Sequence, residues 1–324
     1  MLRTLLLTAV LFIFPAGAIC SSPEALYLVA DSLWKEGEFR AVVKLVNEES
    51  QEEERSPAAT YWMCRAYLGL SDYDSSVFYG ERAVKLAPDS SYYHLWYGQA
   101  LGMKLSQGSG LGGLFRAKKV KGEFQRAIEL DPSNYEAKFN LMQYLLQAPG
   151  IVGGNKDEAF RMAEALKEIK PALGHFAKAL CHQVREEYDK ADWEFRAATA
   201  YDSTNTEFAF NYFYFLLDRE DFSRAEVVLE EIEQTDPDDS NILYQRGKLH
   251  LFSGKDLKRG LGCFREYLRR ERAPGSASFA AAHWRMGMIY EKMEKPDSAR
   301  VEYRICLQLE PDYKEAKKAL KKLK

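Results

Sequence analysis

Prolines that close similar phrases recur along this chain at an almost regular spacing, and this period most restricts the possible fold. They stand at Pro88, Pro132, Pro171, Pro237, Pro274 and Pro311. Successive separations are 44, 39, 66, 37 and 37 residues, and 66 is twice 33. Proline ends an α-helix because it lacks a backbone N–H and its ring clashes with the preceding turn. The period therefore predicts a repeated helix–turn–helix unit, and such units must stack to bury their apolar faces.

Small residues recur near the middle of the expected first helix of a unit. They are Cys64, Gly98, Gly247 and Gly287, and each is followed three residues later by a larger one, namely Tyr67, Leu101, His250 and Tyr290. Small residues let two antiparallel helices approach closely, and the larger ones fill the gap one turn further on. This pattern resembles the tetratricopeptide repeat, a helix–turn–helix unit of about 34 residues. The resemblance implies an all-α, right-handed superhelical solenoid.

The resemblance extends over nearly all of the chain after its N-terminal segment. We expect about eight units within residues 22–313, near 22–55, 56–90, 91–134, 135–171, 172–203, 204–239, 240–274 and 275–313. The first unit lacks the closing proline, and the fifth has Ser203 in its place. Residues 314–324, "KEAKKALKKLK", are expected to form a polar capping helix, which a solenoid needs at its end. A basic amphipathic helix on an anionic membrane is the alternative for this segment.

The N-terminal 18 residues have the pattern of a secretory signal peptide. "MLRT" supplies a positive charge, "LLLTAVLFIF" an apolar run, and Ala16 and Ala18 an A-x-A cleavage pattern. We therefore expect an exported protein, periplasmic or secreted. Cys20 offers an alternative, because "GAICSS" faintly resembles a lipoprotein signal, although Ile19 is not small. A membrane partner is expected only if Cys20 is lipidated.

Composition and motifs exclude several classes of function. The formal net charge of -3, from 45 basic and 48 acidic residues, gives no bulk field for nucleic acid. The cysteines Cys64, Cys181, Cys263 and Cys306 contain no C-x-x-C and are read as buried small hydrophobes, although spacing alone does not exclude disulfides. The sequence has neither H-E-x-x-H nor G-x-S-x-G. We expect no enzyme, metal site or cofactor.

Glycine-rich stretches interrupt the third and fourth units between their two helices. The third carries about ten extra residues with Gly108, Gly110 and Gly113, and the fourth about five, with Gly150, Gly153 and Gly154. The first set formally matches G-x-G-x-x-G, but a dinucleotide site needs a preceding strand, and "GIVGGNK" lacks P-loop spacing. We therefore expect no nucleotide.

Both stretches should project from the same edge of the solenoid, where insertions often form a binding face. We expect a loop ledge that helps to hold a partner or orders neighbouring units. The competing interpretation is that the loops merely pack on each other. The phrase "APGIVGG" also resembles one in a subgroup of exported bacterial repeat proteins.

In this repeat family the first helix of each unit lines the groove. Alignment on the small residues gives a slot that is aromatic in six of seven units: Tyr61, Leu95, Phe139, Phe176, Phe210, Tyr244 and Trp284. One turn further on stand Arg65, Gln99, Gln143, Leu180, Tyr214, Lys248 and Met288, with Asn140 and Asn211 between the two slots. Rings offer contact area and amides pair with a peptide backbone. The alternative is that the rings fill the packing between neighbouring first helices.

These observations predict a non-enzymatic scaffold or assembly factor of the cell envelope that binds a protein or an extended peptide in the groove. Repeat domains that clamp a C-terminal carboxylate place lysine in the aromatic slot, and no unit here does so. Glu136, Glu207 and Asp218 near the groove indicate a basic or neutral partner. The alternative function is a carrier for a non-protein ligand such as a glycan, held by the same rings.

Overall fold

The computed structural model describes residues 23–49, 55–107, 111–270 and 276–323. Every regular element in these ranges is a helix, which confirms the expected all-α class. The expected signal peptide and the residues Cys20, Gly108, Gly110 and Pro274 lie outside the described residues. The chain divides into two compact units, residues 1–154 and residues 155–324, and each is described by itself.

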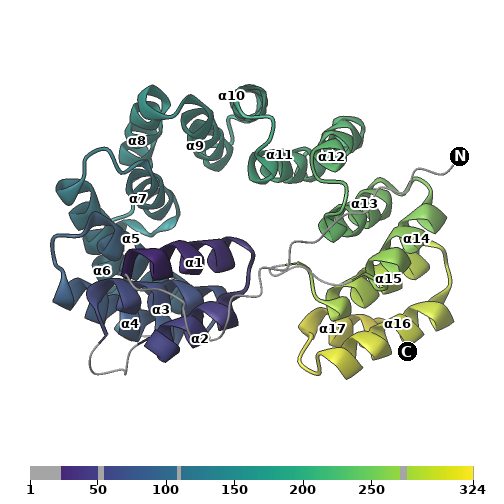
Figure 1. The fold of residues 1–324 in the computed structure, drawn as a ribbon. Coiled ribbons are helices and arrows are strands. Elements are labelled where there is room, and N and C mark those ends of the chain that lie inside the picture. Colours follow the sequence, from purple (N-terminus) through teal and green to yellow (C-terminus); the bar gives the residue numbers. More distant parts are fainter. Residues whose placement is uncertain (1–22, 50–54, 108–110, 271–275, 324) are drawn as a thin grey trace, which may run out of the picture. The chain divides into compact units, whose positions relative to one another are not determined.

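The first compact unit is a series of antiparallel helices that pack in chain order (Figure 1). Its helices are α1 (Pro23–Lys35), α2 (Phe39–Glu49), α3 (Pro57–Gly69), α4 (Tyr73–Leu86), α5 (Ser91–Ser106), α6 (Leu111–Leu130) and α7 (Tyr135–Gln147), followed by the 3-10 helix η2 (Gly150–Val152). The pairs α3 with α4 and α5 with α6 share the most extensive packing. The first helices α1, α3, α5 and α7 also contact one another in sequence. They thereby form a continuous first-helix face of this unit.

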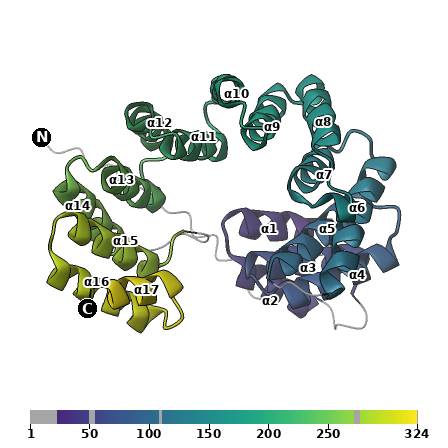
Figure 2. The same ribbon diagram turned by 180° about the vertical axis from the view of Figure 1, so that it is seen from behind.

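The second compact unit repeats the same pairing, as Figure 2 shows from behind. Its helices are α8 (Lys156–Ile169), α9 (Pro171–Val184), α10 (Tyr188–Tyr201), α11 (Thr206–Asp218), α12 (Phe222–Thr235), α13 (Ser240–Ser253), α14 (Leu257–Tyr267), α15 (Phe279–Lys292), α16 (Pro296–Leu309) and α17 (Lys314–Lys322). The pairs are α9 with α10, α11 with α12, α13 with α14, and α15 with α16. Helix α17 packs on α16 through buried Ala316 and exposes its lysines to solvent.

Short polar side chains start many of these helices. The side chain of Ser56 accepts a hydrogen bond from the Ala59 N–H, and Asn134 does the same for Ala137. Such caps pair backbone N–H groups that have no partner within the helix. The expected phrase "DPSN" thus contains both the proline after one helix and the cap of the next. Local sequence therefore sets where each helix begins and ends.

Two glycines in first helices receive an aromatic ring from the second helix. A Cβ added at Gly287 would lie 2.3 Å from the Tyr303 ring, and one at Gly247 would lie 2.7 Å from the Phe264 ring. Tyr303 and Phe264 are fully buried. The small residues of the repeat pattern therefore act as expected, because each makes room for a ring that would otherwise hold the helices apart.

The insertion in the third expected unit is not the long loop that the sequence predicted. Most of the inserted residues are helical: α5 continues to Ser106, and α6 begins at Leu111 and runs for 20 residues. Gly113 consequently lies in the first turn of α6. The following stretch "LFRAKKVKGEFQRAIEL" is rich in strong helix formers, whose summed propensity offsets the cost of the glycines at the start of the helix.

The four described cysteines are buried and form no disulfide with one another, as their apolar surroundings predicted. Burial raises the pKa of the Cys64 thiol to about 12, which makes it a poor nucleophile. Within the described ranges, no helix is both long and apolar enough to cross a bilayer. No group of three or more His, Cys, Asp or Glu side chains in those ranges could hold a metal ion.

Candidate functional site

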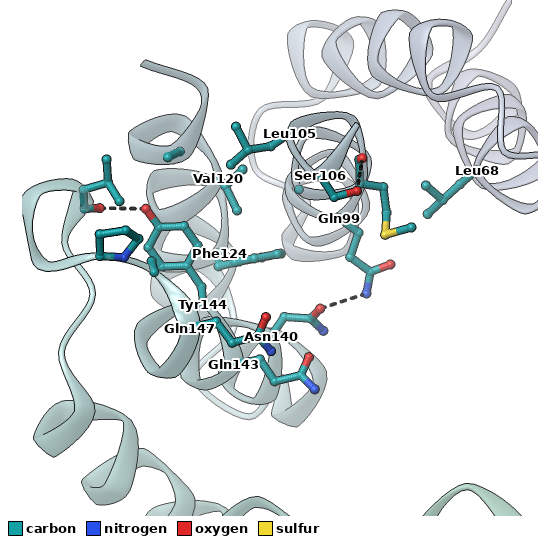
Figure 3. Close-up of a pocket in the computed structure, with 16 residues that line it drawn as sticks. Leu68, Gln99, Leu105, Ser106, Val120, Phe124, Asn140, Gln143, Tyr144 and Gln147 are labelled. Atoms are coloured by element: carbon teal, nitrogen blue, oxygen red, sulfur yellow. Dashed lines mark hydrogen bonds between the residues drawn. The ribbon is translucent and has the colours of Figure 1, made fainter. Parts of the chain in front are cut away.

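A pocket of about 630 Å³ opens on the first compact unit where α5, α6, α7 and η2 meet (Figure 3). Its floor is apolar and comes mainly from α6 and the turn after α7. The floor residues include Leu105, Ala117, Val120, Phe124, Pro149 and Val152. Because these side chains belong to successive segments of the chain, only the stacked fold brings them together.

Side-chain amides line the other side of the pocket. They are Gln99 on α5 and Asn140, Gln143 and Gln147 on α7. The Gln99 Nε2 atom donates a hydrogen bond to Asn140 Oδ1 at 3.4 Å, and Asn140 Nδ2 donates to the Glu136 carbonyl at 2.8 Å. Among the described residues, the amides of Gln143 and Gln147 have no hydrogen-bond partner. Two amides are thus available to an arriving ligand.

The described residues that line the pocket carry no charge. An apolar floor beside uncharged amides suits a ligand with an apolar side chain and hydrogen-bonding groups next to it. A polypeptide has both, because backbone N–H and C=O groups flank each side chain. The polar groups among its described lining residues are uncharged amides and the hydroxyls of Ser106 and Tyr144.

The turn after α7 forms the outer wall of the pocket. Tyr144 Oη donates to the Val152 carbonyl at 2.6 Å, which fixes η2 over α7. Gly153 has a φ of 92°, a left-handed conformation that favours glycine. A Cβ at Gly154 would lie 1.7 Å from the Ala148 carbonyl oxygen, so only glycine fits there. These glycines therefore serve a close backbone turn.

The expected glycine ledge is partly a helix. Gly113 lies in α6, whereas Gly150, Gly153 and Gly154 lie in the turn around η2. Helix α6 contacts η2, and Lys121 Nζ donates to the Gly153 carbonyl at 3.1 Å. The two inserted segments therefore do pack on each other, and together they supply two walls of the pocket.

The structure splits the aromatic column expected along the first helices. Phe176 and Tyr244 are 2% and 7% exposed, and Leu95 is fully buried. Phe176 stacks on Phe208 with centroids 4.6 Å apart, and Tyr244 packs against Phe264. These two rings belong to the core, so their assignment to the groove is wrong. Tyr61, Phe139, Phe210 and Trp284 are half-buried.

Arg65 also differs from its expected role as a groove contact. Its guanidinium carbon lies 4.0 Å from the Trp34 ring centroid and 4.4 Å from both the Trp62 and Trp96 centroids. The side chain is only 11% exposed, because these rings surround it. Tyr61 Oη accepts a hydrogen bond from the same guanidinium at 3.3 Å. Arg65 therefore holds α1, α3 and α5 together through cation–π contacts and has little surface for a ligand.

The remaining groove residues lie on the second compact unit. Asn211 Nδ2 donates to the Glu207 carbonyl at 2.9 Å, as Asn140 does to Glu136. The Nζ atom of Lys248 lies 4.8 Å from the centroid of the Tyr214 ring. Trp284 packs against Tyr313 at 5.5 Å. These residues belong to α11, α13 and α15, whereas the pocket is built entirely from the first compact unit.

The sequence patterns indicate Gln99, Asn140, Gln143 and the η2 turn but not the other lining residues. Val120 lies in the inserted stretch that was expected to be a loop, and Phe124 and Tyr144 lie on helices at positions that no pattern assigned to a site. Gln147 stands one turn after Gln143 on α7, so continuing the amide pattern by four residues would have found it.

Comparisons with known proteins agree with this architecture. Residues 280–313 match the sequence profile of the tetratricopeptide repeat. A tetratricopeptide repeat protein of Thermus thermophilus has a TM-score of 0.53 at 16% identity, over 60% of this chain and 100% of that one. One of Parabacteroides merdae has a TM-score of 0.52 at 12% identity, over 82% and 98%. The human IFIT1 dimer with m7Gppp-AAAA has a TM-score of 0.65 at 12% identity, over 93% and 71%.

These findings define the class of the protein as an all-helical repeat protein whose helices pack in consecutive antiparallel pairs. Residues 280–313 thus match the tetratricopeptide repeat in sequence, and the chain shares its fold with solved tetratricopeptide repeat proteins. No curated protein matches the sequence. A shared fold does not give the function, so the role and the ligand have to be argued from the site.

Proposed function

We propose that this protein is a non-enzymatic scaffold that holds an extended polypeptide segment, with one apolar side chain of that segment in the pocket between α5, α6 and α7. The single observation that carries the proposal is the uncharged pocket with an apolar floor and a row of amides. The free amides of Gln143 and Gln147 would pair with the backbone of the segment. Such a combination recognises peptides through side-chain burial and backbone hydrogen bonds.

Two other ligand classes fit the pocket less well. A glycan would need a ring face exposed for stacking, but Phe124 is 4% exposed and the Tyr144 hydroxyl is bonded to Val152. RNA, which accompanies human IFIT1 in the matched structure, would need cations for its phosphates, and the described lining has none. Polypeptide is therefore the proposed ligand, and the other two classes are outcomes of the test.

The N-terminal apolar run supports a place of action outside the cytoplasm. We expect the protein to be exported and to act in a bacterial cell envelope as a scaffold or assembly factor. Fusion of residues 1–25 to a reporter that is active only after export would test this. A reporter that remains inside the cell contradicts export.

The ligand can be identified by photocrosslinking in the source cells. A benzoylphenylalanine placed at Gln143 lines the pocket, and one placed at Lys85, whose side chain is 72% exposed on α4, is the control. We expect Gln143 to give a discrete adduct that mass spectrometry maps to one stretch of a second polypeptide. A sugar or RNA adduct, or the same adducts at both positions, contradicts the proposal.

A matched pair of variants tests the role of the amides. Gln143→Ala with Gln147→Ala should weaken capture of the mapped peptide about tenfold, because both amides are free to bind it and each lost hydrogen bond contributes about 0.5–1.5 kcal/mol. The control is Asn211→Ala with Tyr214→Phe, which changes two polar side chains of α11 that do not line the pocket. An equal loss in the control would contradict a site at the pocket.

A further inference from the structure

Two cationic side chains on the adjacent first helices α13 and α15 influence each other electrostatically. Lys248 on α13 places Nζ 4.8 Å from the Tyr214 ring centroid. Arg285 on α15 lies over Phe252, its guanidinium carbon 5.1 Å from that centroid, and over Trp284 at 4.2 Å. Lys248 and Phe252 are four residues apart on α13 and so share one face of the helix. Arg285 thus contacts the ring one turn after Lys248, and its charge acts on the Lys248 ammonium group.

Neither head has an ion-pair partner within 4 Å in the described part of the chain. Arg285 Nη1 approaches only the Met288 sulfur, at 3.6 Å, and its Nε atom is buried without a partner. Most other half-buried cations here do have partners: Arg246 pairs with Glu233 at 2.7 Å and Lys178 with Glu194 at 3.0 Å. The Lys248–Arg285 pair thus departs from the rule that buried charges are paired.

The surroundings of Lys248 leave its charge poorly compensated. Burial and the nearby Arg285 lower its pKa to about 8, and the more distant Asp218 opposes them only in part. Tyr214, whose pKa is raised by burial, supplies a ring face and no negative charge. Two like charges on a half-buried face favour a bound anion, because it would compensate both at once.

We propose that Lys248 and Arg285 form a binding site for a carboxylate of an acidic polypeptide. The proposal rests on the proposed function for the kind of partner, a polypeptide, and adds the chemistry of one contact. Arg can bind a carboxylate through two parallel N–H bonds, while Lys adds a point charge. The rings of Phe252 and Trp284 beside the cations would receive the apolar part of the same segment.

This site differs from the carboxylate clamp that sequence analysis excluded, since Tyr244 and Trp284 occupy the slots where the clamp has lysine. It also differs from the expectation of a basic or neutral partner, which was drawn from Glu136, Glu207 and Asp218. Of these, Asp218 is the one that acts on Lys248. A polypeptide is favoured over RNA because two cations are too few for a strand that carries one phosphate per nucleotide.

Three short peptides of one sequence test the site on the full chain by isothermal titration calorimetry. The first has two internal glutamates and an amidated C-terminus, the second has glutamines instead, and the third has glutamines and a free C-terminus. We expect at least tenfold tighter binding of either carboxylate-bearing peptide than of the amidated glutamine peptide. The first and third peptides distinguish a side-chain carboxylate from a terminal one. Equal affinities for all three would overturn the proposal.

A charge-matched pair of variants shows where the carboxylate binds. Lys248→Met with Arg285→Gln should remove the tenfold preference. Lys255→Met with Arg259→Gln, two exposed cations on the following turn and helix, changes the net charge equally and should keep it. If both double variants lose the preference equally, the peptide is attracted by the net charge of the protein, and the proposed site is wrong. A 5′-triphosphate RNA is the competing ligand. If it binds more tightly than the glutamate peptide, and only Lys248→Met with Arg285→Gln loses that binding, the ligand is not an acidic polypeptide.

A second measurement needs no variant. An amine-reactive reagent at pH 8, followed by mass spectrometry of Lys248, should show severalfold protection by the glutamate peptide and none by the amidated glutamine peptide. No protection would overturn the proposal even if the variants failed to fold. Because these probes are synthetic, their failure is distinguishable from failure of the crosslink at Gln143.

Discussion

His175 on α9 and Glu194 on α10 form a buried hydrogen-bonded pair, with Nδ1 and Oε2 2.6 Å apart and side chains only 3% and 4% exposed. Lys178 Nζ lies 3.0 Å from the other oxygen of the same carboxylate. Similar pairs join His94 to Glu123 in α5 and α6, and His283 to Glu302 in α15 and α16. A polar pair between first and second helix thus recurs in three hairpins and fixes how the two helices meet.

Glu194→Ala should lower the free energy of unfolding by about 3 kcal/mol, because it leaves His175 and Lys178 without their buried partner. Glu266→Ala is the control. Glu266 is 44% exposed and pairs with Arg269 and Arg270, so the loss there should stay below about 1 kcal/mol. Urea unfolding followed by circular dichroism measures both. Equal losses of unfolding free energy would mean that the buried pair stabilises the protein no more than the exposed one.

The stabilising effect of Glu123 on His94 should depend on pH. Burial alone would lower the pKa of His94, but the hydrogen bonds to Glu123 and to the Pro88 carbonyl, together with the Glu123 charge, raise it above 6.5. A raised pKa contributes stability that is complete below about 6.5 and is lost as pH rises through the folded-state value. The loss caused by Glu123→Gln should therefore be larger at pH 5.5 than at pH 8.5.

Urea unfolding at these two pH values measures that difference. Glu129→Gln, at an exposed acidic position on the same helix, should show no such trend. A loss caused by Glu123→Gln that is the same at both pH values would contradict the assignment.

The lowered pKa of Lys248 predicts a pH dependence of stability opposite to that of His94. Its pKa is lowered from 10.5 to about 8, so between these values the unfolded chain binds more protons and stability rises with pH. Lys248→Met should therefore stabilise the protein below pH 8, and the gain should shrink toward pH 10.5. The gain is at most about 3 kcal/mol, from about 1.4 kcal/mol per pKa unit. Urea unfolding at pH 7 and pH 9.5 measures it, and Lys255→Met should show no gain at either pH.

Gly287→Ala should destabilise the protein by about 1–3 kcal/mol, since the new methyl group would lie 2.3 Å from the buried Tyr303 ring. Gly262→Ala is a matched control in the middle of α14, where a Cβ meets nothing within 4 Å. The control should be neutral or stabilising by up to about 1 kcal/mol, because alanine is the better helix former. Thermal unfolding of both variants compares them. Two variants of equal stability would show that the α15–α16 packing tolerates a wider separation.

Gly154→Ala should open the turn that walls the pocket. The added Cβ would lie 1.7 Å from the Ala148 carbonyl oxygen, so the turn has to change shape. Limited proteolysis should then cleave between residues 148 and 155 several times faster than in the parent protein, while the helix content stays the same. Gly150→Ala, where a Cβ meets nothing within 4 Å, should leave the cleavage rate unchanged. An unchanged cleavage rate in Gly154→Ala would show that the turn does not require glycine at position 154.

Much of the architecture could be predicted because its signals are local. Cap residues such as Ser56 and Asn134 act within three residues of themselves, and the prolines act on the preceding turn. The small residues of the repeat were equally informative, since Gly247 and Gly287 each face a ring from the second helix of the same hairpin. The inserted part of α6 was misread because glycine near a helix start looks the same in sequence as glycine in a loop.

The candidate site could be predicted only in part, because helical periodicity gives the face of a residue and not its depth. Phe176 and Phe210 occupy the same slot of the repeat, yet the first is core and the second half-buried. The difference comes from neighbours far along the chain, such as Phe208 stacked on Phe176. The spacing of residues in the sequence does not indicate such long-range contacts.

The sequence by itself determined the helical repeat, since period, caps and small residues are short-range properties of the chain. Tertiary structure alone decided which polar groups remain unpartnered, and with them the candidate sites. The amide of Gln143 and the charge of Lys248 look like any surface residues in the sequence. They become candidate binding groups because packing places an apolar floor beside Gln143 and brings Lys248 under the influence of a second cation, Arg285.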